Sequence, residues 1–503
     1  MAESLRVLLL SPEVFPFAKT GGLADVAGSL PKSIKGLGCD IRVAMPYYRM
    51  TKKGDFQVKV IFEDVEIPLF GEVLNDSIFS AEADGGVPLY LINKDEFFDR
   101  EFLYGTSKGD YFDNMERFVY FSRMAFILCK MLDFQPHVFH CNDWQTALIP
   151  AYLRTLYRKD PFFSGTFSVF TIHNIAYQGI FDEKKLGVTG LPMEVYHPGG
   201  MEYWGKINLL KAGIVFSDVV NTVSHAYSRE IQTPEFGYGM EGVLRDRSND
   251  LYGILNGADY GEWNPKTDPL IAANYDEKDL SGKAKCKEDL LAEFNLPGSL
   301  KKLPLLAIIS RLADQKGLDL LAEIMEDLMK MDLGFVLLGT GDEKYHKLFK
   351  SIAKEYPKKA GIKIAYDNTL AHKIEAGSDI FLMPSRYEPC GLNQMYSLKY
   401  GTVPLVRAAG GLDDTIQDYD PKTGEGTGFK FQSYDARDFL DTVRRALAVY
   451  RDGETWKRLI IRGMKADFSW QRAAKEYMDL YRRARAKRKL IPVGKPRAGT
   501  FSG

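Results

Sequence analysis

Short apolar runs alternate with amphipathic helical patterns along most of this chain, and that alternation constrains the fold more than any other feature. Leu5–Leu10 predicts a buried strand, Leu23–Lys35 an amphipathic helix and Ile41–Ala44 the next strand. Strands that alternate with helices in this way are typical of βαβ units around parallel sheets. The sequence therefore predicts an α/β fold. Further strands of this series are expected at Val138–His140, Ser168–Thr171 and Asp218–Asn221, with helices starting at Asn142–Asp143 and after a capping Ser224.

A second series of the same kind begins just after residue 300. It contains at least five units, with strands expected at LLAIIS, GFVLLG, IKIAY, DIFLMP and VPLV and the helix after DIFLMP at Gly391–Tyr400. The polar, turn-rich stretch Asn256–Gly298 separates the two series, as expected of a crossing between domains. We therefore expect two Rossmann-like domains, 1–260 and 261–469. The helical pattern 470–489 is expected to pack back on the first domain, and 490–503 is expected to be a basic tail.

Residues 57–92 interrupt the first series. The runs QVKVIF, VEIPLF, SIFSAEA and VPLYLI are short and alternate between apolar and polar residues, with turns expected at Gly71 and at Gly85–Gly86. Alternation of this kind is typical of antiparallel strands. We expect antiparallel strands inserted into the first sheet.

Charge and composition exclude several classes of partner. The 503 residues include 66 Lys and Arg against 67 Asp and Glu, so no chain-wide positive charge is available to hold a nucleic acid or a membrane surface. A run of bases without acids near the end of the chain could bind nucleic acid, but a solvated helix end whose dipole favours positive charge explains it better. This run contains Arg482, Arg483, Arg485, Lys487, Arg488, Lys489, Lys495 and Arg497.

Three further features predict a soluble, cytoplasmic protein. The five cysteines form no C-x-x-C pair, which argues against a disulfide framework and against a zinc ribbon. The first residues, MAESLRVLLLSPEVF, lack the basic and long apolar regions of a signal peptide. No stretch approaches the roughly 18 uninterrupted apolar residues of a membrane-spanning helix.

Ligands of open α/β sheets bind outside the carboxyl ends of the strands, so the loops after the strands are the places to look for a site. Lys19-Thr20-Gly21-Gly22-Leu23 follows the first strand and precedes a helix. Its glycines would let N–H groups approach an anion, and Lys19 would add a cation. Taken alone, an ordinary tight turn is the commoner explanation.

The equivalent loop of the second series carries Arg311, Lys316 and Gly317 between a strand and a helix. Cations that are merely solvated there would be repelled by the helix dipole, so a bound anion explains them better. The Arg fork and the Lys point charge could neutralise a nucleoside diphosphate without a metal. Gly339-Thr340-Gly341, after the next strand, is a second place where a backbone could approach a ligand.

Two other loops carry polar groups suited to a sugar. Glu388 lies in a turn after the strand DIFLM, where it could accept hydrogen bonds from hydroxyl groups or serve only as a helix-capping acid, and Gly410–Thr415 repeats this pattern. His173 follows the strand at Ser168–Thr171 and has Asn174 and Tyr177 beside it. Loop histidines are more often structural, but these neighbours suit a sugar pocket.

Seven motifs, in order from about residue 5 to 480, carry a resemblance to a known family. They are K-T-G-G-L-A-D-V at 19–26, H-C-N-D-W at 140–144, T-I-H-N-I-A-Y-Q-G at 171–179, N-G-A-D at 256–259, S-R-L-x-x-Q-K-G at 310–317, E-P-C-G-L at 388–392 and G-G-L-x-D-T at 410–415. Together they resemble the bacterial glycogen synthases and the plant starch synthases.

The resemblance implies a glycosyltransferase B-type fold, with two Rossmann-like domains facing a deep cleft. It further implies transfer of glucose from ADP-glucose to the 4-OH at the non-reducing end of an α-1,4-glucan such as glycogen, with retention of configuration and with no metal or cofactor. Front-face displacement, in which the departing phosphate receives the proton of the hydroxyl, belongs to the same expectation. The residues alone leave ADP and UDP open as the donor nucleotide.

The resemblance also assigns roles to residues. Lys19 and Gly22 would line the donor site, Asp143 and His173 would face the transferred glucose, with His173 on its 6-OH, and Arg311 and Lys316 would hold the diphosphate. Glu388 takes the first position of the E-x7-E pattern, but Tyr396 stands where a second acid is usual. The predicted catalytic residues are His173, Glu388, Arg311, Lys316 and Asp143, and the predicted donor-binding residues are Lys19, Gly22, Asn256, Arg311, Lys316, Gly339, Tyr387, Cys390, Gly391, Leu392 and Thr415.

Three other functions fit the sequence less well than glucosyl transfer. A retaining glycosidase needs two carboxylates about 5–5.5 Å apart, and no such pair is apparent in the loops. A nucleotide-sugar epimerase of the same architecture would act without a glucan. A non-catalytic glucan-binding relative would be expected to lack Lys19 or Arg311, and both are present. We expect a monomer or a small homo-oligomer.

Overall fold

The computed structural model describes residues 4–489, which fold into two compact units. The first contains the described residues up to Val223, Ser228–Ile254 and the described residues from Trp470 on, and the second contains Ser224–Tyr227 and Leu255–Ser469. The chain thus passes between the units at Ile254, a few residues before the expected boundary at 260. The segment Ser224–Tyr227 groups with the second unit, where the N–H of Ala226 donates to Asp414 Oδ2 (2.8 Å).

The first unit is built around a nine-stranded sheet in the order β14-β13-β9-β8-β1-β2-β5-β4-β3. All neighbours from β14 to β5 pair in parallel, and these strands are largely buried apart from the edge strand β14. The strands are β1 (Arg6–Leu10), β2 (Asp40–Pro46), β3 (Lys59–Leu69), β4 (Glu72–Ala83), β5 (Val87–Ile92), β8 (Val138–Asn142), β9 (Phe167–Ile172), β13 (Val219–Thr222) and β14 (Leu251–Gly253).

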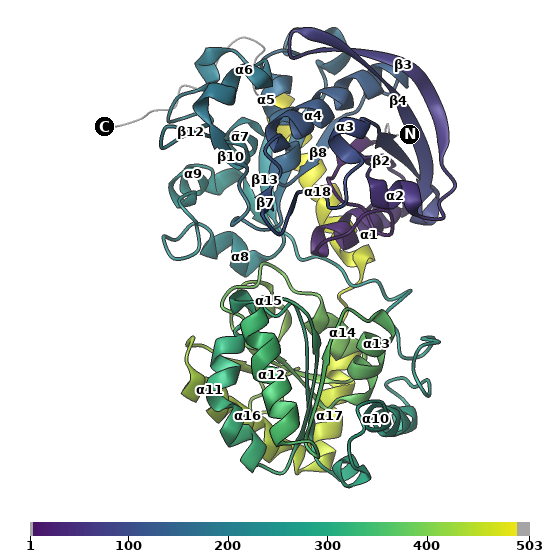
Figure 1. Cartoon of the computed structure of the whole chain (residues 1–503), viewed down its shortest axis with the longest axis vertical. Helices are drawn as coiled ribbons and strands as arrows, with labels where there is room; N and C mark the ends of the chain where they lie inside the picture. Colours follow the sequence, from purple (N-terminus) through teal and green to yellow (C-terminus); the bar gives the residue numbers. More distant parts are fainter. Residues whose placement is uncertain (1–3, 490–503) are drawn as a thin grey trace. The chain divides into compact units, whose positions relative to one another are not determined.

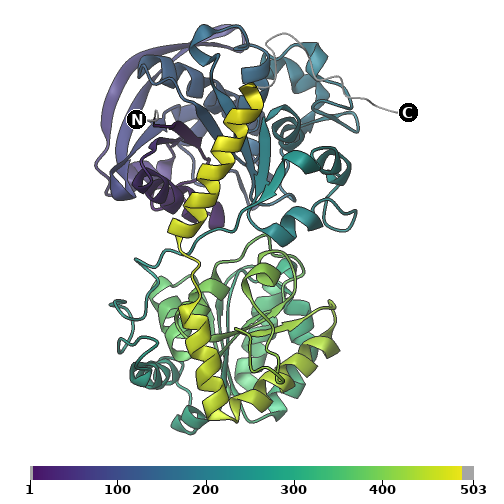
Figure 2. The ribbon, with the colours of Figure 1, turned by 180° about the vertical axis from the view of Figure 1, so that it is seen from behind.

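Helices cover both faces of this sheet (Figures 1 and 2). Helices α1 (Gly22–Gly36) and α18 (Trp470–Lys489) pack together on one face, while α4 (Asn114–Met131), α5 (Leu148–Arg154) and α7 (Leu209–Phe216) cover the other. The chain leaves β1 toward β2 on one side and returns to β8 on the other, so the order of the strands reverses at β1. Ligands of such sheets bind where the order reverses, beside the loops that follow β1 and β8.

The structure corrects the expectation for residues 57–92. The runs QVKVIF and VEIPLF belong to one strand, β3, which is irregular between Val60 and Val65 and forms a hairpin with β4 through the turn at Phe70–Gly71. The run VPLYLI forms β5, which pairs antiparallel with β4 but parallel with β2. Because one edge of β5 continues the parallel sheet, the added strands extend that sheet at its end instead of interrupting it.

The second unit contains a six-stranded parallel sheet in the order β17-β16-β15-β18-β19-β20. Here the order reverses at β15, which places the loops after β15 and β18 at the expected ligand position. Its strands are β15 (Leu305–Ile309), β16 (Gly334–Gly339), β17 (Ala360–Ile364), β18 (Ile380–Met383), β19 (Val403–Arg407) and β20 (Phe429–Phe431).

Helices again lie on both faces of the second sheet (Figure 1). Helices α11 (Leu318–Lys330), α12 (Glu343–Glu355) and α16 (Ala436–Tyr450) lie on one face, and α10 (Ser281–Glu293), α13 (Asn368–Gly377), α14 (Asn393–Lys399) and α17 (Gly453–Lys465) on the other. Helix α14 begins at Asn393 and not at the predicted Gly391, because Gly391 has φ +72° and cannot belong to a right-handed helix. The predicted α/β fold with two parallel sheets is confirmed.

Helix α18 is tied into the first unit by a buried histidine. The hydroxyl of Thr171 donates to Asn221 Oδ1 (2.7 Å), so the His140 Nε2–H donates to Thr171 Oγ1 (2.7 Å). His140 Nδ1 then accepts from the hydroxyl of Tyr481 on α18 (2.8 Å). Burial, with a smaller effect of His173, lowers the pKa of His140 to about 3, so its ring is neutral. The expected tail at 490–503, with Lys495 and Arg497, lies outside the described residues.

Two other expectations concern the described residues. All five cysteines are buried and free, which confirms that they form no disulfide framework. Within residues 4–489, no helix has the length and the apolar character that crossing a membrane requires.

Candidate active site

Asp143 lies directly after β8, where the strand order of the first sheet reverses. The sequence predicts a helix start here, but Asp143 has φ +56°, and a 3-10 turn, Trp144–Thr146, separates it from α5, which begins at Leu148. Its carboxylate caps no helix. Instead, Asp143 Oδ1 accepts the backbone N–H of His173 (2.7 Å), which joins the loops that follow β8 and β9.

The ring of His173 is oriented by Asn142, the last residue of β8. The Asn142 Nδ2 group donates to the carbonyl of Leu10 (3.0 Å), so its Oδ1 faces His173 Nε2 (2.9 Å) and accepts a hydrogen bond from it. Burial lowers the pKa of His173 to about 3, which leaves the ring neutral with its proton on Nε2. The other ring nitrogen, Nδ1, can therefore accept a hydrogen bond.

The surroundings of Asp143 also shift the pKa of its carboxyl. Burial raises the pKa of its carboxyl to about 7, and the negative charge of Glu13 adds to this rise. Hydrogen bonds from the N–H groups of His173 and Asn174 act in the opposite direction but do not cancel the effect of burial. Near neutral pH this carboxyl can accept hydrogen bonds in both of its protonation states and donate one when protonated.

The loop Lys19–Leu23 already donates hydrogen bonds to a carboxylate from elsewhere in the chain. Glu13 is buried and accepts hydrogen bonds from the N–H and the hydroxyl of Thr20 (both 2.5 Å) and from the N–H of Gly21 (3.3 Å). Lys19 pairs with Asp25 (2.6 Å). A Cβ at Gly22 would meet no atom within 4 Å, so open space remains at the start of α1. The sequence predicts the loop but not that Glu13 occupies part of it.

In the second unit, the loops after β15 and β18 meet through an ion pair. Lys316 Nζ lies 2.6 Å from Glu388 Oε2, with side-chain exposures of 20% and 8%. The hydroxyl of Ser385 donates to the same carboxylate oxygen (3.0 Å). Arg311 is more exposed and donates to Gln315 Oε1 (3.2 Å). Lys316 is thus a cation held in one position, and Glu388 Oε1 faces away from this pair of bonds.

Glycines allow these loops to approach one another closely. A Cβ at Gly317 would lie 1.9 Å from the carbonyl oxygen of Pro384, and one at Gly411 would lie 2.1 Å from that of Cys390. Gly339 was predicted to contact a ligand. A Cβ there would lie 2.0 Å from the carbonyl oxygen of Ser310, so packing alone already requires this glycine.

The remaining predicted residues of the second unit cluster around Gln394. Gln394 Nε2 donates to the carbonyls of Cys390 (3.0 Å) and Gly391 (3.1 Å) and to Thr415 Oγ1 (3.2 Å). Burial raises the pKa of the Cys390 thiol to about 12, and the backbone N–H of Asn256 lies against its sulfur. The carbonyl of Tyr387 accepts from Gln315 (3.4 Å), and Leu392 precedes α14. The structure therefore brings Asn256, Lys316, Tyr387, Glu388, Cys390, Gly391, Leu392 and Thr415 together.

Tyr396, at the position where a second acid is usual, belongs to the core of the second unit. Its ring stacks on Trp263 (4.2 Å between centroids), which in turn stacks on His372 (3.8 Å). The residue at this position therefore has a packing role.

Sequence reasoning missed Glu13, Asn142 and Ser385, each of which orients a predicted residue or its loop. Their positions carried a usable indication, because all three lie at or just after the carboxyl end of a strand.

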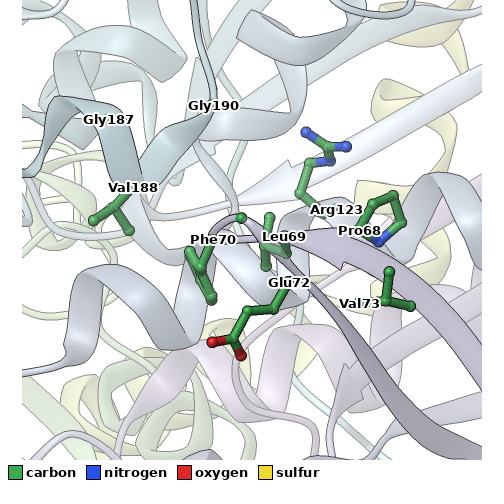
Figure 3. Close-up of a pocket in the computed structure, with 10 residues that line it drawn as sticks. Pro68, Leu69, Phe70, Glu72, Val73, Arg123, Gly187, Val188 and Gly190 are labelled. Atoms are coloured by element: carbon green, nitrogen blue, oxygen red, sulfur yellow. The ribbon is translucent and has the colours of Figure 1, made fainter.

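A cavity of about 660 Å³ lies elsewhere in the first unit, beside the β3–β4 turn (Figure 3). It is lined by Pro68–Val73, Arg123, Gly187, Val188 and Gly190, none of which was predicted as a site residue.

Two family models match the chain. One describes the starch synthase catalytic domain and covers residues 6–246, and the other describes group 1 glycosyl transferases and covers residues 293–465. Together with two parallel sheets whose loops carry the polar residues described above, these matches define a glycosyltransferase of the B-type fold.

More specifically, the chain belongs to the glycogen synthase family, which includes the starch synthases. It is 49% identical to the glycogen synthase of Koribacter versatilis over 97% of this chain and 100% of that protein, and 48% identical to that of Thermotoga maritima over 96% and 99%. The catalytic domain of starch synthase IV from Arabidopsis thaliana, solved with ADP and acarbose, has a TM-score of 0.89 and 33% identity and covers 96% of this chain and 100% of that domain.

Proposed function

We propose that this protein transfers glucose from ADP-glucose to the 4-OH at the non-reducing end of an α-1,4-glucan such as glycogen, with retention of configuration and without a metal or cofactor. Sequence identities of 48–49% to proteins named glycogen synthase, over nearly the full length of the chain, support the glucan product. The ADP and acarbose in the solved starch synthase support an adenine nucleotide and a glucan-like ligand. We further propose that the enzyme acts in the cytoplasm as a monomer or small homo-oligomer.

The observation that carries this proposal is the fixed cation at the strand reversal of the second sheet. Lys316 has three N–H donors, and Glu388 accepts one of them, so donors remain for phosphate oxygens. Arg311, in the same loop, adds a planar fork suited to phosphate. Two preorganised cations favour the departure of a nucleoside diphosphate because they stabilise the negative charge that develops on it.

We propose that groups of the first unit bind the glucosyl residue. His173 Nδ1 would accept a hydrogen bond from the 6-OH, and Asp143 would bind a neighbouring hydroxyl. Burial opposes the charged form of both groups, which suits a neutral ligand. In the second unit, Glu388 Oε1 would accept a further sugar hydroxyl while Oε2 remains paired with Lys316.

The proposed reaction is a front-face displacement. The bond between C1 and the phosphate oxygen breaks, the bond between C1 and the acceptor O4 forms on the same face, and the proton of the 4-OH passes to the departing phosphate. No carboxylate is needed as a nucleophile. In this proposal Glu388, held in place by its ion pair with Lys316, acts as a hydrogen-bond acceptor.

Initial rates with ADP-glucose and with UDP-glucose on a glycogen primer test the proposal. We expect ADP-glucose to be the better donor, the new linkages to be cut by an exo-hydrolase specific for α-1,4 bonds, and NMR of the product to show the α anomer. Release of ADP without extension of the glucan would overturn it. Formation of an epimeric nucleotide sugar in the absence of glucan would identify an epimerase instead.

A further inference from the structure

Trp204 occupies an unusual position at the turn between β11 (Glu202–Tyr203) and β12 (Lys206–Asn208). Trp204 and Gly205 both have positive φ, 52° and 74°, so they form the two-residue turn that Asn-Gly or Gly-Gly fits best. A bulky residue is disfavoured in this conformation, and the Trp204 ring is 86% exposed. Local stability does not explain this residue. Phe70 takes the same conformation in the β3–β4 hairpin, however, so the turn alone does not indicate a ligand, and the neighbours of Trp204 are needed to distinguish the two positions.

Other aromatic rings lie beside this turn. The Tyr203 ring contacts Trp204 edge to face (6.4 Å between centroids, 71° between planes), and the Tyr203 hydroxyl donates to the carbonyl of Tyr238 (3.4 Å). Gly239 makes room for this contact, because a Cβ there would lie 2.1 Å from the Tyr203 hydroxyl. Tyr238 is itself 43% exposed.

Hydrogen bonds link these rings to the loop that carries His173. Gln178, five residues after His173, donates through Nε2 to the carbonyl of Tyr238 (3.0 Å). Gln178 also accepts through Oε1 from Asn208 at the end of β12 (2.7 Å). Tyr177, its neighbour in the chain, is 54% exposed. Tyr177, Tyr203, Trp204 and Tyr238 thus belong to segments that these hydrogen bonds join to the proposed sugar-binding loop, and we call the four residues the aromatic ridge.

We propose that the aromatic ridge binds the α-1,4-glucan acceptor outside the transfer site, an inference that rests on the proposed function. Glucose rings present C–H faces that pack on aromatic faces, while their hydroxyl groups stay in water. Such contacts need no net charge in the ligand, and the ridge itself supplies none, since Glu202 and Lys206 beside it carry opposite charges. A few exposed rings are also far smaller than the roughly 800 Å² that each partner of a stable protein interface buries.

The acceptor length should reveal this contact. A long glucan reaches the ridge and the transfer site together, whereas maltotriose is too short to gain from both. Trp204→Asn places a residue that favours the turn at this position, so the variant should fold at least as well as the natural chain. We expect its KM for glycogen to rise about fivefold or more, with kcat/KM for maltotriose within about twofold of the natural value.

The chain offers a matched control in the β3–β4 hairpin. Phe70 and Gly71 form a turn of the same type, with φ 59° and 83°, and Phe70 is 39% exposed but far from His173 in the chain. Phe70→Asn should leave both acceptors unaffected, and Trp204→Phe should restore most of the glycogen affinity. Native gels that contain glycogen measure binding in the absence of donor, because a protein that binds glycogen is retarded in them. Of these three variants, only Trp204→Asn should migrate faster than the natural protein.

The outcomes separate this inference from the proposed function. If the natural protein extends neither acceptor, the proposed function fails. If it extends both, and Trp204→Asn keeps the natural KM for glycogen and the natural mobility, the ridge does not bind glucan. An equal loss on glycogen and maltotriose would also overturn the inference, since it would place Trp204 in the transfer site. Self-association that disappears in Trp204→Asn would identify a second copy of the chain as the occupant.

Discussion

The two units share an architecture but differ in how they treat the polar groups at the strand reversals. In the first unit, burial moves the pKa of His173 down to about 3, so its ring is neutral, and that of Asp143 up to about 7, so near neutral pH its carboxyl is only partly charged. In the second unit, the buried Glu388 forms an ion pair with Lys316, whose side chain is 20% exposed. The same fold therefore supports a nearly neutral set of hydrogen-bonding groups in one unit and a charged set in the other.

This difference follows from what surrounds each loop. Asp143 accepts a hydrogen bond from a backbone N–H, and His173 donates one to the amide oxygen of Asn142, so neither partner carries a charge. Lys316 and Glu388, by contrast, each have an opposite charge as their partner. The contrast fits the proposed division of the donor, with the neutral sugar bound by the first unit and the diphosphate by the second.

The largest effect is expected from removing the charges of the second unit. Lys316→Ala and Arg311→Ala should each lower kcat by about 10²–10³, or about 2.7–4 kcal/mol, because each removes a preorganised cation from the proposed diphosphate site. Steady-state kinetics with ADP-glucose and glycogen provide the measurement. Lys344→Ala, which removes an exposed cation that pairs with Asp314, should leave kcat near its natural value.

The two variants should differ in stability. Lys316→Ala leaves Glu388 buried without its cation and should cost about 1–3 kcal/mol of unfolding free energy, whereas exposed Arg311→Ala should cost little. The double variant Lys316→Ala/Glu388→Gln should regain stability but not turnover. Recovery of turnover in the double variant would mean that Lys316 acts only by neutralising Glu388.

In the first unit, Asp143 should affect stability in a way that depends on pH. Its folded-state pKa of about 7 lies above the ordinary 3.8, so the stability contributed by the protonated carboxyl is fully present below pH 3.8 and is lost as the pH rises through about 7. Asp143→Asn cannot ionise. Relative to the natural protein, it should therefore gain on the order of 2–4 kcal/mol between pH 4 and pH 8.

Urea unfolding of both proteins across this range measures the gain. Glu101→Gln, at an exposed position of the same unit, should show a difference from the natural protein that does not change with pH. A constant difference for Asp143→Asn would mean that its carboxyl is ionised throughout, and the contrast between the two units would then fail.

His140 should make the stability depend on pH in the direction opposite to Asp143, with an effect of comparable or smaller size. Its folded-state pKa of about 3 lies below the ordinary 6.5, so its contribution is present above pH 6.5 and is lost as the pH falls toward 3. The opening free energy obtained from amide exchange in β8 and α18, corrected for the intrinsic exchange rate at each pH, should therefore fall on acidification. His140→Gln stays neutral and should reduce this fall by about 2 kcal/mol or more, with His197→Gln, at an exposed position, as the control.

The fold was largely predictable because the alternation of apolar runs and helical patterns is a local property. Leu5–Leu10 and the run GFVLLG correspond to β1 and β16 almost residue for residue. Residues 57–92 were harder, because alternation predicts a strand but not the direction of its partner. Strand β5 pairs in both directions, which depends on β2, far away in the chain.

The site was predictable as a set of loops but not as a set of contacts. Lys316 and Glu388 are 72 positions apart, and no local pattern indicates that they form an ion pair. Glu13 likewise reaches Tyr104, 91 positions away, as well as the loop at Thr20. Gly339 was predicted as a ligand contact, but the close approach of another backbone already explains it, as it also explains Gly317 in the neighbouring loop. Sequence patterns locate such loops, while tertiary packing decides what each side chain contacts.

The smallest effect is expected from a chelator, and it tests whether the charges of the second unit suffice for the diphosphate. A transferase that lacks preorganised cations depends on a divalent ion to neutralise the leaving phosphate. Here Lys316 is held by Glu388 Oε2 and Arg311 lies in the same loop, so excess EDTA should change the rate of glucan synthesis by less than about twofold.

Enzyme treated with EDTA and then supplied with Mg²⁺ is the control. If EDTA abolished synthesis and Mg²⁺ restored it, a metal would carry the charge that we attribute to Arg311 and Lys316. If only Lys316→Ala became dependent on Mg²⁺, the ion would be replacing the missing cation, which would place Lys316 at the diphosphate.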